Sequence, residues 1–215
     1  LYLFFHHDCY YVLEVLDRSI LGDFFIALCN NTYLNETAKK VGPRMGANKV
    51  VAGNTIPQLI ETIQYLNEYR IAVTVDCLGE FVETKEESLH AKQQILEIIE
   101  AIQYFNVEAH MSVKISQLGS KFDLDLAYEN MREILLKADE CGKMHINIDT
   151  EKYHSLQQIQ HVLDKLKGEF KNVGTVVQAY LYEAEDLIDK DPDLRLRLVK
   201  GANKEDETIA EHAKE

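Results

Sequence analysis

Four short apolar segments of the sequence each carry a polar or charged side chain that could bind a ligand: Lys114, Asp149, Gln178 and Arg197. Side chains alternate between the two faces of a β-strand, so each of these segments has one apolar face and one polar face. If such strands are parallel and covered by helices, their polar faces line the inside of a closed barrel. We therefore expect the four side chains to point into one ligand-binding cavity at the mouth of a barrel.

The sequence around these residues alternates between helical and extended patterns. Apolar residues at helical spacing predict helices over 55–70, 86–105, 125–141, 155–170 and 184–189. Alternating apolar segments predict strands over 72–78, 108–118, 144–149, 175–181 and 194–202. Helices between the strands imply parallel pairing, and no Gly-rich phosphate-binding fingerprint follows the first strand, which favours a barrel over a doubly wound sheet. The expected fold class is α/β, a TIM-like (βα)8 barrel of which about five βα units are present.

The first fifty or so residues do not follow this repeat. Loosely spaced phenylalanine and leucine residues precede Gly42-Pro43, which ends their pattern. We expect residues 1–53 to form an N-terminal helical arm and residues 54–215 to form the barrel domain, incomplete at its C-terminus. At roughly 30 residues per βα unit, the three missing units would need about 90 more residues.

The composition indicates which classes of binding partner and which cellular compartment fit this chain. The 215 residues carry a formal net charge of −13, which argues against nucleic acid and against an anionic membrane surface as electrostatic partners. Acidic residues interrupt the apolar start of the chain, so we expect neither a signal peptide nor a membrane span there. The four cysteines have neither CxxC nor zinc-ligand spacing, which fits reduced thiols in a cytoplasmic protein.

Five motifs occur in order, each at the carboxyl end of an expected strand. They are Leu78-Gly79-Glu80-Phe81, Ser112-Val113-Lys114-Ile115-Ser116-Gln117-Leu118, Asn147-Ile148-Asp149, Val177-Gln178-Ala179-Tyr180 and Arg197-Leu198-Val199-Lys200-Gly201-Ala202. Together, from about residue 21 onward, they closely resemble the monofunctional bacterial proline dehydrogenases, which are FAD-dependent distorted (βα)8 barrels. The resemblance implies oxidation of L-proline to 1-pyrroline-5-carboxylate, the first step of proline catabolism, with electrons passed to a quinone or another acceptor. It also implies a cytoplasmic enzyme with peripheral contact to the inner face of the membrane for electron transfer, and it leaves the oligomeric state open.

The resemblance assigns one set of residues to the flavin. Carried over by position, FAD would be held by Gln178, Arg197, Val199, Lys200 and Gly201. The chemistry agrees with two of these residue types. Taking a hydride from a carbon beside an amine leaves the flavin ring anionic, so fixed cations at Arg197 and Lys200 would stabilise it.

A second set is assigned to the substrate. Lys114 would help to bind the proline carboxylate close to the flavin, Asp149 would orient cationic groups of the pocket, and Glu80 would form an ion pair that gates the site. Three further residues would line the pocket with Lys114: Leu198, Ala202 and Asn203. The family usually has tyrosine in place of the last of these. Independently of the family, a small amino acid needs its carboxylate held by a cation. An inward lysine in turn needs a carboxylate partner, and Asp149 on the next strand is available.

Two other functions stay open on the sequence alone. The first is a non-catalytic or truncated homologue without a full flavin and substrate site. It stays open because the family's tyrosine is missing and because the family's late arginine pair would fall beyond residue 215. His145 and Asp149 allow a metal-dependent barrel hydrolase, although no second ligand pair is visible and no metal is expected. A bound flavin that proline bleaches would separate the first hypothesis from both alternatives.

Overall fold

The structure is a computed structural model that describes residues 2–3, 53, 55–77, 82–201, 205–206 and 208–210. The chain forms two compact units, residues 1–75 with 107–109, and residues 76–106 with 110–215. The helical arm predicted over 1–53 lies outside the described residues, apart from strand β1 (Tyr2–Leu3) and Gly53.

In the smaller unit, helix α4 (Ile56–Glu68) begins where the sequence predicts. The side chain of Thr55 caps it by accepting a hydrogen bond from the Gln58 backbone N–H, and a proline occupies the first turn. Its apolar face buries Leu59, Ile60, Ile63 and Leu66. At the other end of the helix, the Asn67 amide donates to the Glu108 carbonyl at 3.0 Å and accepts from the Glu108 N–H at 2.7 Å. This pair ties the helix end to residues 107–109 of the same unit.

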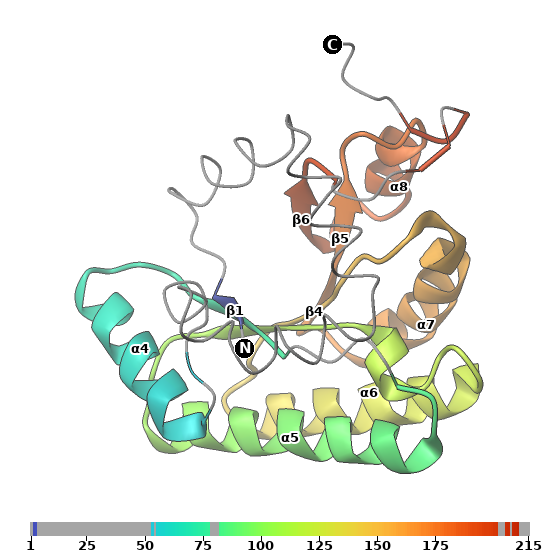
Figure 1. Ribbon diagram of the computed structural model, residues 1–215. Coiled ribbons are helices and arrows are strands. Elements are labelled where there is room, and N and C mark those ends of the chain that lie inside the picture. The colour runs from blue at the N-terminus through green and yellow to red at the C-terminus, as the bar shows by residue number, and fades with distance from the viewer. Residues whose placement is uncertain are drawn as a thin grey trace, which may run out of the picture. The chain divides into compact units, whose positions relative to one another are not determined.

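The larger unit alternates strands and helices in chain order (Figure 1). The larger unit begins at Asp76, which is the last residue of strand β2 (Thr74–Asp76). The elements that follow are α5 (Lys85–Tyr104), β3 (His110–Val113), the 3-10 turn η3 (Ile115–Leu118), α6 (Leu124–Glu140), β4 (Ile146–Ile148), the 3-10 turn η4 (Tyr153–Ser155), α7 (Leu156–Glu169), β5 (Val173–Gln178), α8 (Ala184–Lys190) and β6 (Arg195–Val199). Strands β3 to β6 pair in parallel, each with the next one along the chain. This order confirms the predicted α/β fold, a TIM-like barrel present in part.

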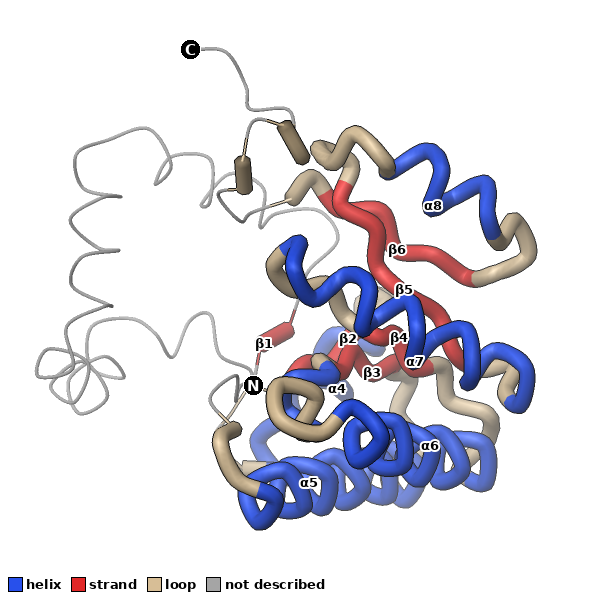
Figure 2. The backbone as a smooth tube through the Cα atoms, turned by 90° about the vertical axis from the view of Figure 1, so that its right-hand side faces the viewer, coloured by secondary structure: helices blue, strands red, loops and turns tan. Residues whose placement is uncertain are grey.

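Helix boundaries in this unit follow local capping signals. Helix α5 starts with a capping box, in which the Thr84 hydroxyl accepts from the Glu87 N–H and the Glu87 carboxylate accepts from the Thr84 N–H. Helix α6 starts at Asp123, whose carboxylate accepts from the Leu126 N–H at 2.9 Å. Helices α5, α6 and α7 follow one another around one side of the strands (Figure 2). Because these helices cover that side, the apolar faces of the strands are buried against them.

The apolar core fixes how the strands lie. Met111 and Val113 of β3, and Ile146 and Ile148 of β4, are fully buried. The helices contribute Ile95, Ile99, Ile134, Leu135, Val162, Leu163 and Leu166. Burial of one such side chain stabilises the fold by about 1.5–3 kcal/mol. A shift of register by one residue would turn this apolar set away from the helices, so the core also determines which side chains point to the other face.

The strand predicted over 108–118 is shorter in the structure. Strand β3 ends at Val113, Lys114 keeps an extended backbone with φ −90° and ψ 131°, and Ile115–Leu118 form a 3-10 turn. Ile115 and Leu118 lie three residues apart and both stay buried, as the three-residue repeat of a 3-10 turn permits. Gly119 then closes the turn with φ 105°, a conformation that favours glycine.

Gly174 of β5 leaves room for a histidine on the neighbouring strand segment. A Cβ atom at this position would lie 2.8 Å from His145 Cε1 and would also collide with the Arg195 carbonyl of β6. We expect Gly174→Ala to lower the free energy of unfolding by about 2 kcal/mol, measured by urea denaturation. Gly168→Ala in α7 is the control, because no atom lies within 4 Å of its Cβ position and alanine favours a helix over glycine. A Gly174→Ala variant as stable as the wild type would contradict this packing.

Candidate active site

Four charged side chains of the larger unit meet in one cluster. Lys114 Nζ lies 2.7 Å from Asp76 Oδ2 and 2.9 Å from Asp149 Oδ2. Arg197 Nη2 lies 2.8 Å from Asp149 Oδ1 and donates to Ser112 Oγ at 3.2 Å. Asp149 therefore binds one cation with each of its two oxygens, and Lys114 binds two carboxylates. We call Asp76, Lys114, Asp149 and Arg197 the charge cluster.

The strands bring these residues together through ordinary parallel pairing. Val113 of β3 pairs with Ile148 of β4, so the next residues along both strands, Lys114 and Asp149, lie side by side. The Asp149 N–H donates to the Val113 carbonyl at 2.9 Å and extends this pairing by one step. Arg197 lies in the middle of β6, from where its side chain reaches Ser112 on β3. The polar faces that alternation predicts for these strands thus point toward one another.

The cluster is largely withdrawn from water and balanced in charge. Asp76 and Asp149 are 2% and 7% exposed. The side chains of Lys114 and Arg197 are mostly buried as well. Burying an ion is costly unless oppositely charged groups contact it, and here two carboxylates face two cations. Loss of any one member would leave a net charge in a site that has little water to solvate it.

Burial and ion pairing act in opposite directions on Lys114. Burial alone would lower the pKa of its ammonium group, but the adjacent carboxylates of Asp149 and Asp76 raise the pKa above its usual value. Burial raises the pKa of Asp76, although Lys114 acts in the other direction. The two directions are compatible, since two carboxylates share one ammonium group and Asp149 opposes ionisation of Asp76. Lys114 is therefore a protonated donor throughout the neutral range.

The residues predicted to bind FAD occupy neighbouring positions on β5 and β6. Gln178 is buried, and its amide donates to Thr150 Oγ1 at 2.9 Å and to the Glu151 carbonyl at 3.2 Å. It holds the loop that follows Asp149 and is not part of the charge cluster. Val199 is the register partner of Gln178 and is half-buried, whereas Lys200 is exposed.

Gly201 follows β6 in a conformation that favours glycine. Its φ is 103°, and a Cβ atom there would overlap the ring of Tyr180. The carbonyl of the preceding residue, Lys200, accepts from the Tyr180 N–H at 3.1 Å. The backbone after β6 therefore packs closely on the end of β5, with no room for a side chain at this glycine.

Among the pocket-lining residues predicted beside Lys114, the structure describes Leu198. Leu198 is 59% exposed, because alternation along β6 puts it on the opposite face from Arg197. Glu80, Ala202 and Asn203 lie outside the described residues. Their roles stay predictions.

Asp76 is a member of the cluster that the sequence interpretation missed. It follows Val73, Thr74 and Val75, and the alternation of that segment sets Asp76 on the same face as Thr74, opposite the two valines. The sequence signal that could have identified Asp76 was a carboxylate on the inner face at the end of a strand. A three-residue strand is short, so an acid at its end resembles an ordinary loop residue.

Among the described residues, His145 and Asp149 are not part of a cluster of three or more side chains that could hold a metal ion. His145 Nε2 lies 3.0 Å from Asn147 Oδ1, and burial lowers the pKa of the imidazole to about 4, so it is neutral at pH 7. Within the described part of the chain, no three histidine, cysteine, aspartate or glutamate side chains gather in a way that could hold a metal ion. In the same part, no helix combines the length and hydropathy that crossing a bilayer requires.

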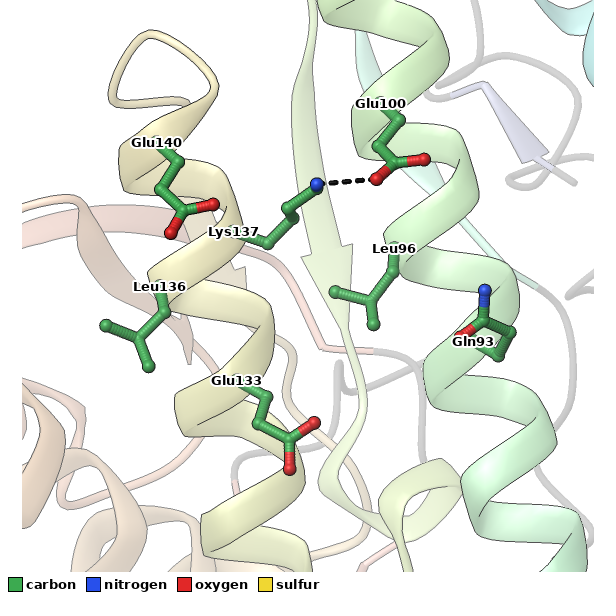
Figure 3. Close-up of a pocket in the computed structure, with 7 residues that line it drawn as sticks. All are labelled: Gln93, Leu96, Glu100, Glu133, Leu136, Lys137 and Glu140. Atoms are coloured by element: carbon green, nitrogen blue, oxygen red, sulfur yellow. Dashed lines mark ion pairs between the residues drawn. The ribbon is translucent and has the colours of Figure 1, made fainter.

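A separate groove lies on the outer surface between α5 and α6 (Figure 3). Its lining residues are Gln93, Leu96, Glu100, Glu133, Leu136, Lys137 and Glu140. Lys137 forms an ion pair with Glu100 across it. None of these residues belongs to the charge cluster, and the groove is a feature of helix packing.

Comparisons with known proteins place this chain in a family. The sequence matches the family described as proline dehydrogenase over residues 59–215. It is 38% identical to proline dehydrogenase 2 of Bacillus subtilis (strain 168) over 193 residues, which cover 89% of this chain and 63% of that protein. It is 34% identical to the proline dehydrogenase of Deinococcus radiodurans over 171 residues, which cover 76% of this chain and 55% of that protein.

A solved structure shares the fold. Proline utilization A (PutA) from Bdellovibrio bacteriovorus, inactivated by N-propargylglycine, matches with a TM-score of 0.67 at 20% sequence identity, over 78% of this chain and 21% of that one. The chain spans 63% of the length of the Bacillus relative above. The family match extends from helix α4 through all the strands and helices of the larger unit. The chain belongs to the proline dehydrogenase family.

Proposed function

We propose that the protein that carries this sequence oxidises L-proline to 1-pyrroline-5-carboxylate, with FAD as its cofactor and a quinone or another acceptor receiving the electrons. The observation that carries the proposal is the buried charge cluster, in which two cations and two carboxylates meet where the family's motifs lie. Family membership favours this activity over a non-catalytic homologue and over a metal-dependent hydrolase. The enzyme would be cytoplasmic and would contact the inner face of the membrane, where it would transfer electrons to the quinone.

Lys114 is proposed to bind the substrate carboxylate. An ammonium group has three N–H donors, and two of them are directed at Asp76 and Asp149. The third can donate to the carboxylate of proline in a charge-assisted hydrogen bond. Holding that carboxylate fixes the ring, so that the carbon to be oxidised is presented in one orientation. The substrate loses a hydride from the ring carbon beside its nitrogen and a proton from the nitrogen, which yields the C=N bond of the product.

The donor set around β5 and β6 fits FAD. A dinucleotide carries two phosphates and a ring edge rich in hydrogen-bonding atoms, and Arg197, Lys200 and Gln178 supply two cations and an amide. Val199 and Gly201 would add backbone contacts, since Gly201 takes a conformation that other residues rarely adopt. FAD, when bound, supplies the hydride acceptor. Asp149 would hold both Lys114 and Arg197 in place for substrate and cofactor.

Four further residues complete the proposed site. Glu80 would form the ion pair that gates substrate entry. Leu198, Ala202 and Asn203 would line the pocket around the proline ring, where asparagine replaces the tyrosine usual in the family. The shape of this pocket would then differ from that of relatives that keep the aromatic ring.

The test is spectroscopic. We expect the purified protein to show the absorbance of a bound flavin, and L-proline added without oxygen to bleach it and to support reduction of an artificial dye. Pyrrolidine, the same ring without a carboxylate, is the control and should react at least about a hundredfold more slowly, because Lys114 would have nothing to bind. A flavoprotein that ignores proline would contradict the proposed substrate. A colourless protein without dye reduction would favour the non-catalytic alternative.

A further inference from the structure

Asp76 at the end of β2 is the second carboxylate that contacts Lys114, beside Asp149 after β4. We propose that Asp76 is a positioning residue, which directs the remaining N–H of Lys114 toward the substrate carboxylate. The inference rests on the proposed function, because it concerns how Lys114 binds proline.

The surroundings of Asp76 indicate that its carboxylate serves Lys114. It is 2% exposed, its Oδ2 lies 2.7 Å from Lys114 Nζ, and its Oδ1 is buried with no hydrogen-bond partner among the described residues. A buried carboxylate with one unsatisfied oxygen is costly, and an apolar residue of similar size would be cheaper at a purely structural position. The retained charge thus points to a role in the site rather than in packing.

Two contacts are needed to set the direction of an ammonium group. With Asp149 alone, the Lys114 head could turn about a single hydrogen bond, and Asp149 also binds Arg197 through its other oxygen. With Asp76 as a second acceptor, two of the three tetrahedral N–H directions are occupied, and the third is then determined. Because Asp76 acts on Lys114, which is proposed to hold the substrate, its effect is expected on the substrate and not on the flavin.

The charged groups that face Lys114 set its titration. They are the carboxylates of Asp76 on β2 and Asp149 after β4, with the guanidinium of Arg197 on β6 beyond Asp149. The thiol of Cys77 is also near, but burial raises its pKa to about 11, so it is uncharged near neutrality. Removing the charge of Asp76 takes away one attraction while the burial cost stays, so the pKa of Lys114 falls. Because a protonated Lys114 is the donor, the alkaline loss of kcat/KM should then begin at lower pH.

The experiment compares Asp76→Asn with a structural control, Asp123→Ala, in proline oxidation assays. The control removes the cap of α6 and lowers stability through the loss of a helix-capping hydrogen bond, without touching the charge cluster. We expect Asp76→Asn to raise KM for L-proline about tenfold, with kcat changed less than about threefold and flavin content unchanged. Its alkaline limb in kcat/KM should shift to lower pH, whereas Asp123→Ala should leave both KM and the pH profile as in the wild type.

The same substitution in a Lys114→Met background separates positioning from a general structural effect. If Asp76 acts through Lys114, Asp76→Asn should cause no further loss of kcat/KM in that background. An equal further loss, or an unchanged KM and pH profile in the single variant, would overturn the inference while the wild type still oxidises proline. A wild-type protein that does not oxidise proline would overturn the proposed function and this inference with it.

Discussion

Lys114→Met is expected to lower kcat/KM for L-proline by at least about a hundredfold, since it removes the charge-assisted hydrogen bond proposed between Lys114 and the substrate carboxylate. Most of this loss should appear in KM if the lysine binds ground state and transition state alike, and in kcat if orientation is lost as well. Steady-state dye reduction with L-proline measures both. Unchanged kcat/KM would show that Lys114 does not bind the substrate.

The same variant should acquire a distinctive pH dependence of stability. Without the ammonium group, burial and the nearby charge of Asp149 both raise the pKa of Asp76 in the folded state, and no cation on Lys114 opposes them. The folded variant then binds more protons than the unfolded chain, so its stability falls as the pH rises above the ordinary pKa of an aspartic acid and through the raised pKa of Asp76. Urea denaturation at several pH values measures this slope.

A surface lysine provides the control for both effects. Lys137→Met removes the ion pair with Glu100 on the outer groove, where water can solvate the remaining carboxylate. Surface pairs of this kind contribute about 1 kcal/mol or less. We expect Lys137→Met to leave kcat/KM and the pH dependence of stability as in the wild type.

The helices of this fold were largely predictable because their ends are encoded locally. Thr55, the pair Thr84 and Glu87, and Asp123 each satisfy backbone N–H groups of the first turn, and such caps can be seen in a few residues of sequence. The ion pair between Lys114 and Asp149 could also be predicted. The alternation of side chains shows which face of each strand the two residues share, and the parallel order of the strands shows that the two strands are neighbours. These inferences need no knowledge of distant contacts.

What escaped prediction depends on contacts that are distant in sequence. The inward position of Asp76 follows from its pairing with Lys114, 38 residues away. Strand β5 begins at Val173, earlier than predicted, although Gly174 weakens a strand locally; the glycine is tolerated because His145 fills the space beside it. The end of β3 at Val113 could not be predicted from the apolar pattern. Ile115 and Leu118 are buried in the 3-10 turn, so apolar residues continue past the end of the strand.

Asp149→Asn is expected to be the most destabilising single substitution in the charge cluster. One carboxylate binds two cations here, Arg197 Nη2 through Oδ1 at 2.8 Å and Lys114 Nζ through Oδ2 at 2.9 Å. The neutral amide would leave both cations short of a counter-charge in a site that water reaches poorly. Breaking a buried pair by removing one partner costs several kcal/mol, so we expect the free energy of unfolding to fall by about 3 kcal/mol.

The chain contains a matched control for that substitution. Asp164 also binds two cations with its two oxygens, Lys167 Nζ at 2.8 Å and Lys190 Nζ at 2.9 Å, but its side chain is 42% exposed. Asp164→Asn should therefore cost less than about 1 kcal/mol, and added salt should weaken that contribution further while affecting the buried one little. Urea denaturation of both variants at low and high salt, with L-proline oxidation assayed in parallel, measures the difference. Equal losses of stability would mean that burial does not strengthen the hold of Asp149 on Lys114 and Arg197, and retained activity in Asp149→Asn would remove Asp149 from the proposed site.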